Sequence, residues 1–241
     1  MNVEELERTI RQHEGIALSE AFPALMRKVY LWMTLALAIS GVAAYGVASS
    51  PGLLQTIYSS KLIYFGLIIA ELVLVWKVTG SVWKPGRSLA ATTLMFILFS
   101  ALNGATLAYI FAAFAPAAIV KTFMITAGTF GVTAAYGYFT RRDLTKLGGL
   151  LMMGLIGVVI AGVVNLFLHS SGLDMVVSIL GVLVFVGLTA WDSQRIKMQL
   201  AMAEDLGEQS QKIALAGALS LYLDFVNLFL YLLRFFGGSR E

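Results

Sequence analysis

The chain has 241 residues, of which 59% are hydrophobic and 13% charged, and its mean hydropathy is +0.82. A soluble domain is typically about 45–50% apolar and about 25% charged, so this composition excludes a soluble enzyme and indicates an integral membrane protein. The sequence contains no cysteine, which excludes disulfides, thiolate metal sites and a thiol nucleophile. The net charge is +3. In a membrane protein, basic excess belongs to loops held on the cytoplasmic side, which argues against nucleic acid as a partner.

Long apolar runs recur along the chain, and a helix needs about 20 mostly apolar residues to cross the hydrocarbon core of a bilayer. Such runs predict seven membrane-spanning helices, over Val29–Ala48, Leu62–Val78, Leu89–Phe114, Ala117–Phe139, Leu147–Leu168, Met175–Trp191 and Ile213–Phe236. The fold class is therefore an all-α membrane bundle. A six-span version, in which the last helix enters the membrane and returns, stays open at this point.

Lysine and arginine are unevenly distributed over the segments between these helices. Of the 17 basic residues, 13 fall on the side that holds the N-terminus and 4 on the other side. Because basic residues are retained on the cytoplasmic side, the N-terminus is predicted to be cytoplasmic and the C-terminus to be outside.

Three segments follow from this topology: a cytoplasmic N-terminal segment (1–28), the transmembrane domain (29–236) and a short C-terminal tail (237–241). No cleaved signal peptide is visible in the first segment. Its pairs Glu4/Arg8 and Glu7/Arg11 have the i,i+4 spacing that supports a helix. An interfacial helix and a frayed polar tail are both compatible with this pattern.

The last predicted span carries a polar stripe. Ser220, Asp224, Asn227 and Tyr231 recur at i, i+4, i+7 and i+11, so on a helix they share one face. An ionisable side chain within the hydrocarbon is costly and points by default to a function. Because the stripe must face protein or water, we expect this helix to be central and Asp224 to be functional.

Two further acids lie in the predicted spans. Asp192 ends the sixth span, where an i,i+3 pair with Arg195 is a simple structural explanation, and Glu71 lies in the middle of the second. At about 1.5 Å per residue, Asp224 lies about 18 Å, Glu71 about 15 Å and Asp192 about 26 Å from the outer face. Spacing alone therefore does not prove that Asp192 and Asp224 meet.

If the two aspartates do meet, they would share one proton and titrate as a unit. Losing that proton would leave two carboxylates that repel each other, admit water and attract a divalent cation. Calcium prefers such oxygen ligands, so the pair suggests a pH-gated cation path.

Three segments resemble a known family. Gly217–Phe229, followed by Leu232-Leu233-Arg234-Phe235-Phe236-Gly237, closely resembles the last-helix signature of the Bax inhibitor-1 (TMBIM) family, bacterial branch. Asp192-Ser193-Gln194-Arg195-Ile196 resembles the segment after the sixth helix of that family. Arg142-Asp143-Leu144 with Leu147-Gly148 fits its loop between the fourth and fifth helices.

The resemblance implies six helices around a central seventh in the bacterial inner membrane, a paired-aspartate pH sensor and a calcium leak. On this basis Asp192 and Asp224 become the sensor and the calcium ligands, and Glu71 becomes an acid that lines the path. Calcium is then the transported ion, and no cofactor is expected. One feature departs from the family, whose second helix carries an arginine that latches the aspartate pair closed. This sequence has Gly80-Ser81-Val82-Trp83 in that region.

A second hypothesis is a non-conducting regulator that binds a membrane protein such as an AAA-type protease through its N-terminal segment, with the aspartates purely structural. Two other hypotheses, an intramembrane aspartyl protease and a retinal-binding protein, are excluded because the residues they require are missing. The Gly-x-Gly-Asp signature of presenilin-type proteases is absent, and no lysine that could hold retinal lies in Ile213–Phe236. The sequence therefore predicts a protein that is not an enzyme, with Ser220, Asn227, Tyr231 and Arg195 supporting the aspartates.

Overall fold

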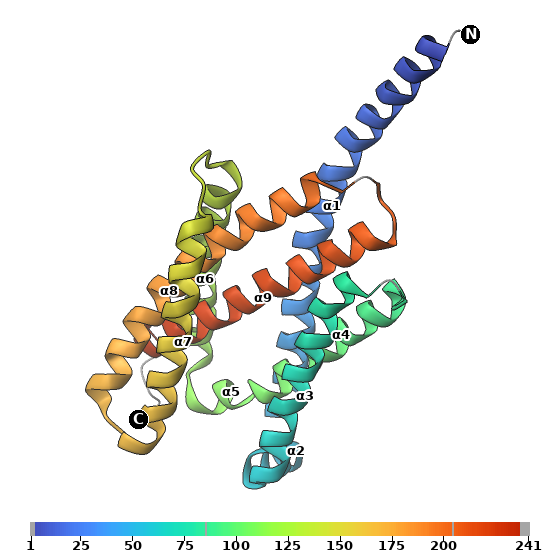
Figure 1. Cartoon of the computed structure of the whole chain (residues 1–241). Helices are drawn as coiled ribbons and strands as arrows, with labels where there is room; N and C mark the ends of the chain where they lie inside the picture. The colour runs from blue at the N-terminus through green and yellow to red at the C-terminus, as the bar shows by residue number, and fades with distance from the viewer. Residues whose placement is uncertain (1–2, 85, 204, 237–241) are drawn as a thin grey trace.

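The structure is a computed structural model that describes residues 3–84, 86–203 and 205–236, with side chains from residue 21 onward. The described residues form helices and connecting turns (Figure 1). The helices are α1 (Val3–Ala48), α2 (Pro51–Ser59), α3 (Lys61–Thr79), the 3-10 helix η1 (Gly80–Trp83), α4 (Leu89–Thr106), α5 (Tyr109–Ala113), α6 (Pro116–Phe139), α7 (Thr145–Leu168), α8 (Ser171–Ala201) and α9 (Glu208–Phe236).

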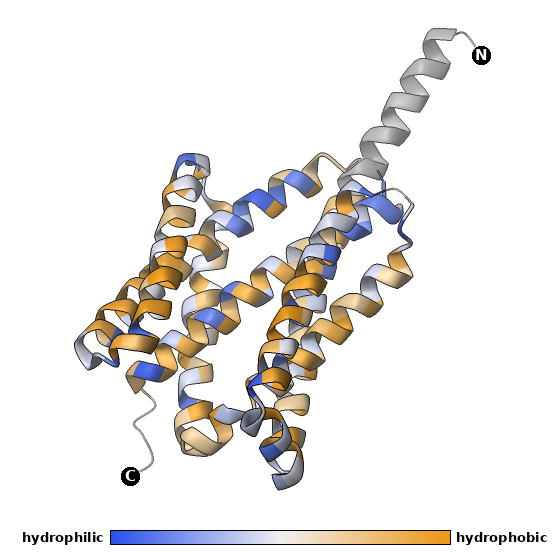
Figure 2. Ribbon diagram, turned by 60° about the horizontal axis from the view of Figure 1, so that its bottom comes forward, coloured by the Kyte–Doolittle hydropathy of each residue, from blue (hydrophilic) through white to orange (hydrophobic). Residues whose placement is uncertain are grey.

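Seven helical stretches in the described residues are long and apolar enough to cross a membrane, which confirms the predicted number. They are Ala21–Ala48, Lys61–Trp83, Leu89–Ala113, Pro116–Phe139, Thr145–Leu168, Ser171–Ala201 and Glu208–Phe236. Hydrophobic residues dominate the sides of these helices, and hydrophilic residues gather at the loops and near the end of α8 (Figure 2).

Several helix boundaries differ from the prediction. The sixth helix does not end beside Asp192, as expected, but continues to Ala201, because the charged residues Arg195 and Lys197 end the apolar run without interrupting helical hydrogen bonding. The third span is not one continuous helix. It breaks after Thr106, and the hydroxyl of Tyr58 donates to the carbonyl oxygen of Thr106 at 2.9 Å.

The N-terminal helix α1 runs without interruption from Val3 to Ala48, past Pro23. The side chains of the Glu4/Arg8 and Glu7/Arg11 pairs and the C-terminal tail (237–241) lie outside the described residues. The division of the chain into these segments therefore stays a prediction.

The last helix, α9, is the most buried of the seven, with 61% of its most apolar 18-residue window buried inside the protein. It packs against α1, α3, α4, α6 and α8, whereas α7 packs chiefly against α8. Because α9 is one unbroken helix, it contains no turn at which it could enter the membrane and return, which favours seven spans over six. The arrangement of six helices around the seventh stays a prediction.

Two glycines allow close approach to α8 around Asp192. A Cβ atom at Gly137 of α6 would collide with the backbone carbonyl of Ala190, and one at Gly148 of α7 with the indole of Trp191. Both helices therefore pack tightly on the turn of α8 that precedes Asp192.

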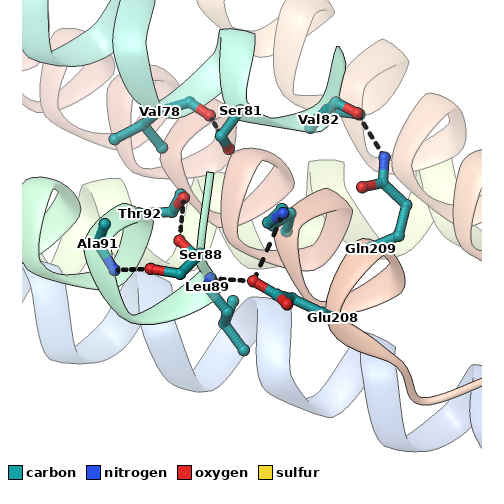
Figure 3. A network of polar contacts seen from close by, with 10 residues as sticks. Val78, Ser81, Val82, Ser88, Leu89, Ala91, Thr92, Glu208 and Gln209 are labelled. Carbon is teal, nitrogen blue, oxygen red and sulfur yellow. Dashed lines mark hydrogen bonds and ion pairs between the residues drawn. The ribbon is translucent and has the colours of Figure 1, made fainter. Parts of the chain in front are cut away.

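We call the end of the bundle that carries the loops 84–88, 140–144 and 202–207 the basic end, and the other the opposite end. At the basic end, Lys212 of α9 is almost fully buried, with its ammonium 3.5 Å from Oε1 of Glu208. The same carboxylate accepts a hydrogen bond from the backbone N–H of Leu89, and the Gln209 side chain donates to the carbonyl oxygen of Val82 (Figure 3). These contacts fix the start of α9 to the end of η1 and the start of α4.

Candidate functional site

A cavity of about 380 Å³ lies between α7, α8 and α9. Its polar lining consists of six residues predicted from the sequence to form or support the site: Asp192, Arg195, Ser220, Asp224, Asn227 and Tyr231. Its apolar lining includes Met152, Leu155 and Val159 of α7. We call this space the aspartate cavity.

The two aspartates meet in this cavity. Asp192 and Asp224 are only 6% and 5% exposed, and both line this one cavity between α8 and α9. A hydrogen bond between two carboxyl groups requires that one of them carries a proton. Among the described residues, Oδ2 of Asp224 has no hydrogen-bond partner, and Oδ1 of Asp192 has only its ion pair with Arg195.

The difference in depth calculated from residue counts did not predict this meeting. That calculation treats helices as rods that are parallel to the membrane normal and end at equal levels. In the structure α8 extends to Ala201, and α9 begins at Glu208; in the view of Figure 1 the start of α9 lies below the end of α8. The two helices also run obliquely through the bundle (Figure 1), so residue counts do not measure their relative depth.

Arg195 provides the positive charge beside the pair. Its Nη2 lies 2.9 Å from Oδ1 of Asp192 and donates to Oγ of Ser220 at 3.2 Å. The guanidinium also lies 4.6 Å from the ring centroid of Trp191. The side chain is 37% exposed, so Arg195 links the buried carboxyl to the polar surroundings of the helix end.

The stripe on α9 continues towards the opposite end of the bundle. The amide Nδ2 of Asn227 donates to the carbonyl oxygen of Leu223 at 2.8 Å, which leaves its Oδ1 as an acceptor. One helical turn further on, the ring of Tyr231 stacks on Phe185 of α8, with 5.9 Å between ring centroids. The cavity is thus lined by oxygen atoms near its aspartates and by the ring of Tyr231 towards the opposite end.

Glu71 does not join this cavity. It lies in a separate polar network, where the side chains of Asn103 and Thr106 both donate to its carboxylate, the amide at 3.0 Å. Oδ1 of Asn103 accepts from the hydroxyl of Tyr222 at 2.8 Å, and that hydroxyl lies 2.6 Å from Oγ of Ser40. The network joins α1, α3, α4 and α9, away from α7 and α8.

Two basic residues that follow Glu71, Lys84 and Arg87, make their contacts at the end of α3 and not with the aspartate pair. The guanidinium of Arg87 donates to the carbonyl oxygen of Lys77 at 2.5 Å, and the ammonium of Lys84 lies 5.6 Å from the ring centroid of Trp76. Both side chains therefore cover the end of α3. Of the described basic residues, Arg195 is the one that pairs with the aspartates.

Sequence reasoning missed the role of Gln194. Its Oε1 accepts from the backbone N–H of Leu144, and its Nε2 donates to the carbonyl oxygen of Arg142, both at 2.8 Å. The two segments Asp192–Ile196 and Arg142–Leu144, each noted for its resemblance, are thus in direct contact. Their co-occurrence was the available signal, but a single sequence does not state which residues touch.

The family of the chain follows from comparison with known proteins. The family model "Inhibitor of apoptosis-promoting Bax1" matches residues 23–241. The inner membrane protein YbhL of Escherichia coli is 43% identical over 219 residues, which cover 89% of this chain and 92% of YbhL. An uncharacterised protein of Borreliella burgdorferi is 44% identical over 216 residues, covering 90% of this chain and 92% of that protein.

A more distant relative covers nearly the whole chain. An uncharacterised membrane protein of Streptococcus pyogenes is 34% identical over 233 residues, which represent 97% of this chain and 99% of that protein. The matched family is one of membrane proteins and is not a known enzyme family. With its seven membrane-capable helices, the chain therefore belongs to the Bax inhibitor-1 family, among the bacterial inner membrane proteins that resemble YbhL.

Proposed function

We propose that the protein is a pH-sensitive leak for calcium ions, with Asp192 and Asp224 as its proton sensor. The observation that carries this proposal is the meeting of the two buried carboxyl groups in one cavity beside Arg195. With one shared proton, the pair carries a single negative charge, which Arg195 balances. In that state the hydrogen bond joins α8 to α9.

Loss of the shared proton changes the balance of charge. Two carboxylates then face one guanidinium, and like charges in a poorly solvated site repel strongly. The repulsion favours separation of α8 from α9 and entry of water. Two carboxylates, with the Ser220 hydroxyl and the Asn227 amide oxygen on the same stripe, offer the oxygen ligands that calcium prefers. Flux should therefore rise as the pH rises.

The asymmetry of basic residues supports an orientation for this leak. The basic end, which carries Asp192 near the last turns of α8, would face the cytoplasm because Lys and Arg are retained on that side. The sensor would then respond to the cytoplasmic pH, and the membrane potential would drive cations inward through the bundle.

The test is calcium flux into liposomes that contain the purified protein, from about pH 5 to pH 8, the range in which a proton-sharing carboxyl pair can titrate. Wild type should show flux that rises with pH. In Asp224→Asn the amide can donate to Asp192 without a titratable proton, so flux should stay low and lose its pH response. Asp205→Asn, which removes an exposed acid in the loop 202–207, is the matched control and should behave as wild type.

Two results would overturn the proposal. One is flux no higher than in empty liposomes at every pH, from protein that is shown to be folded; this result would favour the non-conducting regulator. The other is an unchanged pH response in both Asp224→Asn and Asp192→Asn, which would remove the pair from the sensor.

A further inference from the structure

A second cavity, of about 450 Å³, lies between the same three helices at the opposite end of the bundle. Its polar lining is made of Asn165, His169, Asp174, Tyr231 and Arg234. We call it the outer cavity. Arg234 Nη1 lies 2.9 Å from Oδ1 of Asp174, and both side chains are about half exposed (47% and 49%). The charges at its mouth are therefore balanced and remain accessible to water.

One edge of the outer cavity lies at the turn between α7 and α8, where His169 is part of its lining. His169 has a φ of 50°, in the left-handed region, and ends α7 with a hydrogen bond from its N–H to the carbonyl oxygen of Asn165 at 2.8 Å. The Oδ1 of Asn165 accepts from the N–H of Ser170 at 3.0 Å. Because the side chain of Asn165 holds this turn, the cavity has a defined edge.

The outer cavity and the aspartate cavity share two lining residues, Val159 of α7 and Tyr231 of α9. Val159 is apolar and 55% exposed. Tyr231 is the last member of the polar stripe that begins at Ser220. The two polar cavities therefore meet at one tyrosine ring.

The ring of Tyr231 packs against one face of α8 and lies close to the guanidinium of Arg234. An added Cβ atom at Gly181 of α8 would lie 2.7 Å from the ring, so the glycine leaves the space that the ring occupies. Phe185 stacks on the ring at 5.9 Å between centroids, and the guanidinium of Arg234 lies 5.6 Å from its centroid. The ring is thus positioned by its neighbours and does not simply fill a gap.

We propose that the aspartate cavity and the outer cavity are two halves of one cation passage between α7, α8 and α9, and that the ring of Tyr231 is the gate between them. The inference rests on the proposed leak, because it assigns the route by which a cation reaches the aspartate pair. The ring must move for a hydrated ion to pass. Asp174 neutralises Arg234, which would otherwise repel a cation at the entrance.

The absence of cysteine from the chain permits a test that does not depend on flux. A single cysteine is introduced as Asn227→Cys in the aspartate cavity and exposed to a membrane-impermeant cationic methanethiosulfonate reagent. Asp174→Cys at the mouth of the outer cavity serves as the reference. The reagent is applied from the membrane face at which this cysteine reacts. The rate of labelling is compared in the native background and with Tyr231→Ala.

Removal of the ring should raise the rate of labelling of Asn227→Cys about tenfold, which corresponds to about 1.4 kcal/mol less free energy of opening. The rate at Asp174→Cys should not change. Phe229→Ala is the matched control, because this ring lies on α9 but packs against Phe123 of α6, with 6.3 Å between centroids. Gly181→Ala displaces the ring without removing it and should also raise the rate of labelling of Asn227→Cys. This variant provides the test if Tyr231→Ala does not fold.

Equal labelling of Asn227→Cys with and without the tyrosine ring would overturn the gate, as would no labelling in any background of folded protein. Flux measurements separate this result from a failure of the leak. A gate without a leak would show the change in labelling but no calcium flux in any variant. A leak without this gate would show pH-dependent flux that Tyr231→Ala leaves unchanged.

Discussion

Tyr222 and Asp224 lie two residues apart on α9 and take part in polar contacts on opposite sides of the helix. Two residues correspond to a rotation of about 200° around the helix axis. The hydroxyl of Tyr222 contacts Ser40 and Asn103 of α1 and α4, whereas the carboxyl group of Asp224 lies in the aspartate cavity with Asp192. One side of α9 is therefore anchored by neutral hydrogen bonds, and the other carries the group whose charge can change.

The anchoring side should contribute to stability more than to pH sensing. Tyr222→Phe removes a buried hydroxyl but keeps the ring, whose centroid lies 5.7 Å from that of Phe99. Loss of hydrogen bonds between membrane helices costs about 0.5–2 kcal/mol. We expect a lower free energy of unfolding, measured in detergent by thermal or denaturant titration, and an unchanged pH response of any flux.

Tyr136→Phe is the control for this prediction, because its ring on α6 is 51% exposed. It should leave the stability as in wild type. Equal stability of the two variants would show that the Tyr222 network does not hold α9, and a changed pH response in Tyr222→Phe would mean that the two sides of the helix are coupled.

The residue pattern predicted the number of membrane-capable helices and the face of α9 that lines the aspartate cavity. Both follow from local features, namely the length of apolar runs and the spacing of Ser220, Asp224, Asn227 and Tyr231 along one helix. Asp192 was correctly placed beside Arg195 because i,i+3 neighbours meet on any helix. These conclusions do not depend on how helices are arranged around one another.

Features that depend on tilt and rotation could not be predicted. Residue counts gave Glu71 and Asp224 similar depths below the outer face of the membrane. In the structure these acids nevertheless lie in separate networks, because α3 and α8 approach α9 on different sides. The extension of α8 to Ala201 and the break after Thr106 reflect helix ends set by hydrogen bonds. Hydropathy reports where a chain leaves the hydrocarbon, which is a different boundary.

The close packing of α6 on α8 gives a second stability prediction. Gly137→Ala places a methyl group against the backbone carbonyl of Ala190, two residues before Asp192. A backbone atom cannot rotate away, so α6 must shift, and overpacking of this kind typically costs about 1–3 kcal/mol. We expect a lower melting temperature in detergent and a disturbed aspartate pair.

Gly131→Ala on the same helix is the matched control, because nothing lies within 4 Å of its added Cβ atom. Alanine is favoured over glycine in a helix by about 1 kcal/mol, so this variant should be as stable as wild type or more stable. Destabilisation of similar size at both positions would show that contact with the Ala190 carbonyl does not determine the result.

The contact between Gln194 and the loop 140–144 gives the third prediction. Gln194→Ala removes the acceptor of the Leu144 N–H and the donor to the Arg142 carbonyl. Because the lost bonds bind the start of α7 to α8, the amide of Leu144 should exchange with deuterium about tenfold faster, equivalent to about 1.4 kcal/mol of local opening. Hydrogen–deuterium exchange with mass spectrometry of peptides that cover the loop measures this change.

Gln211→Ala tests whether the effect is local, since the side chain of Gln211 donates to the carbonyl oxygen of Leu206 in the loop 202–207. That variant should speed exchange around Leu206 and leave the loop 140–144 unchanged. Gln194 lies two residues after Asp192 on α8 and holds the segment that precedes α7. Because α7 lines one side of the aspartate cavity, loosening of this segment should also increase the mobility of that side. If exchange at Leu144 does not change in Gln194→Ala, the loop is held by its own backbone and the start of α7 does not depend on α8.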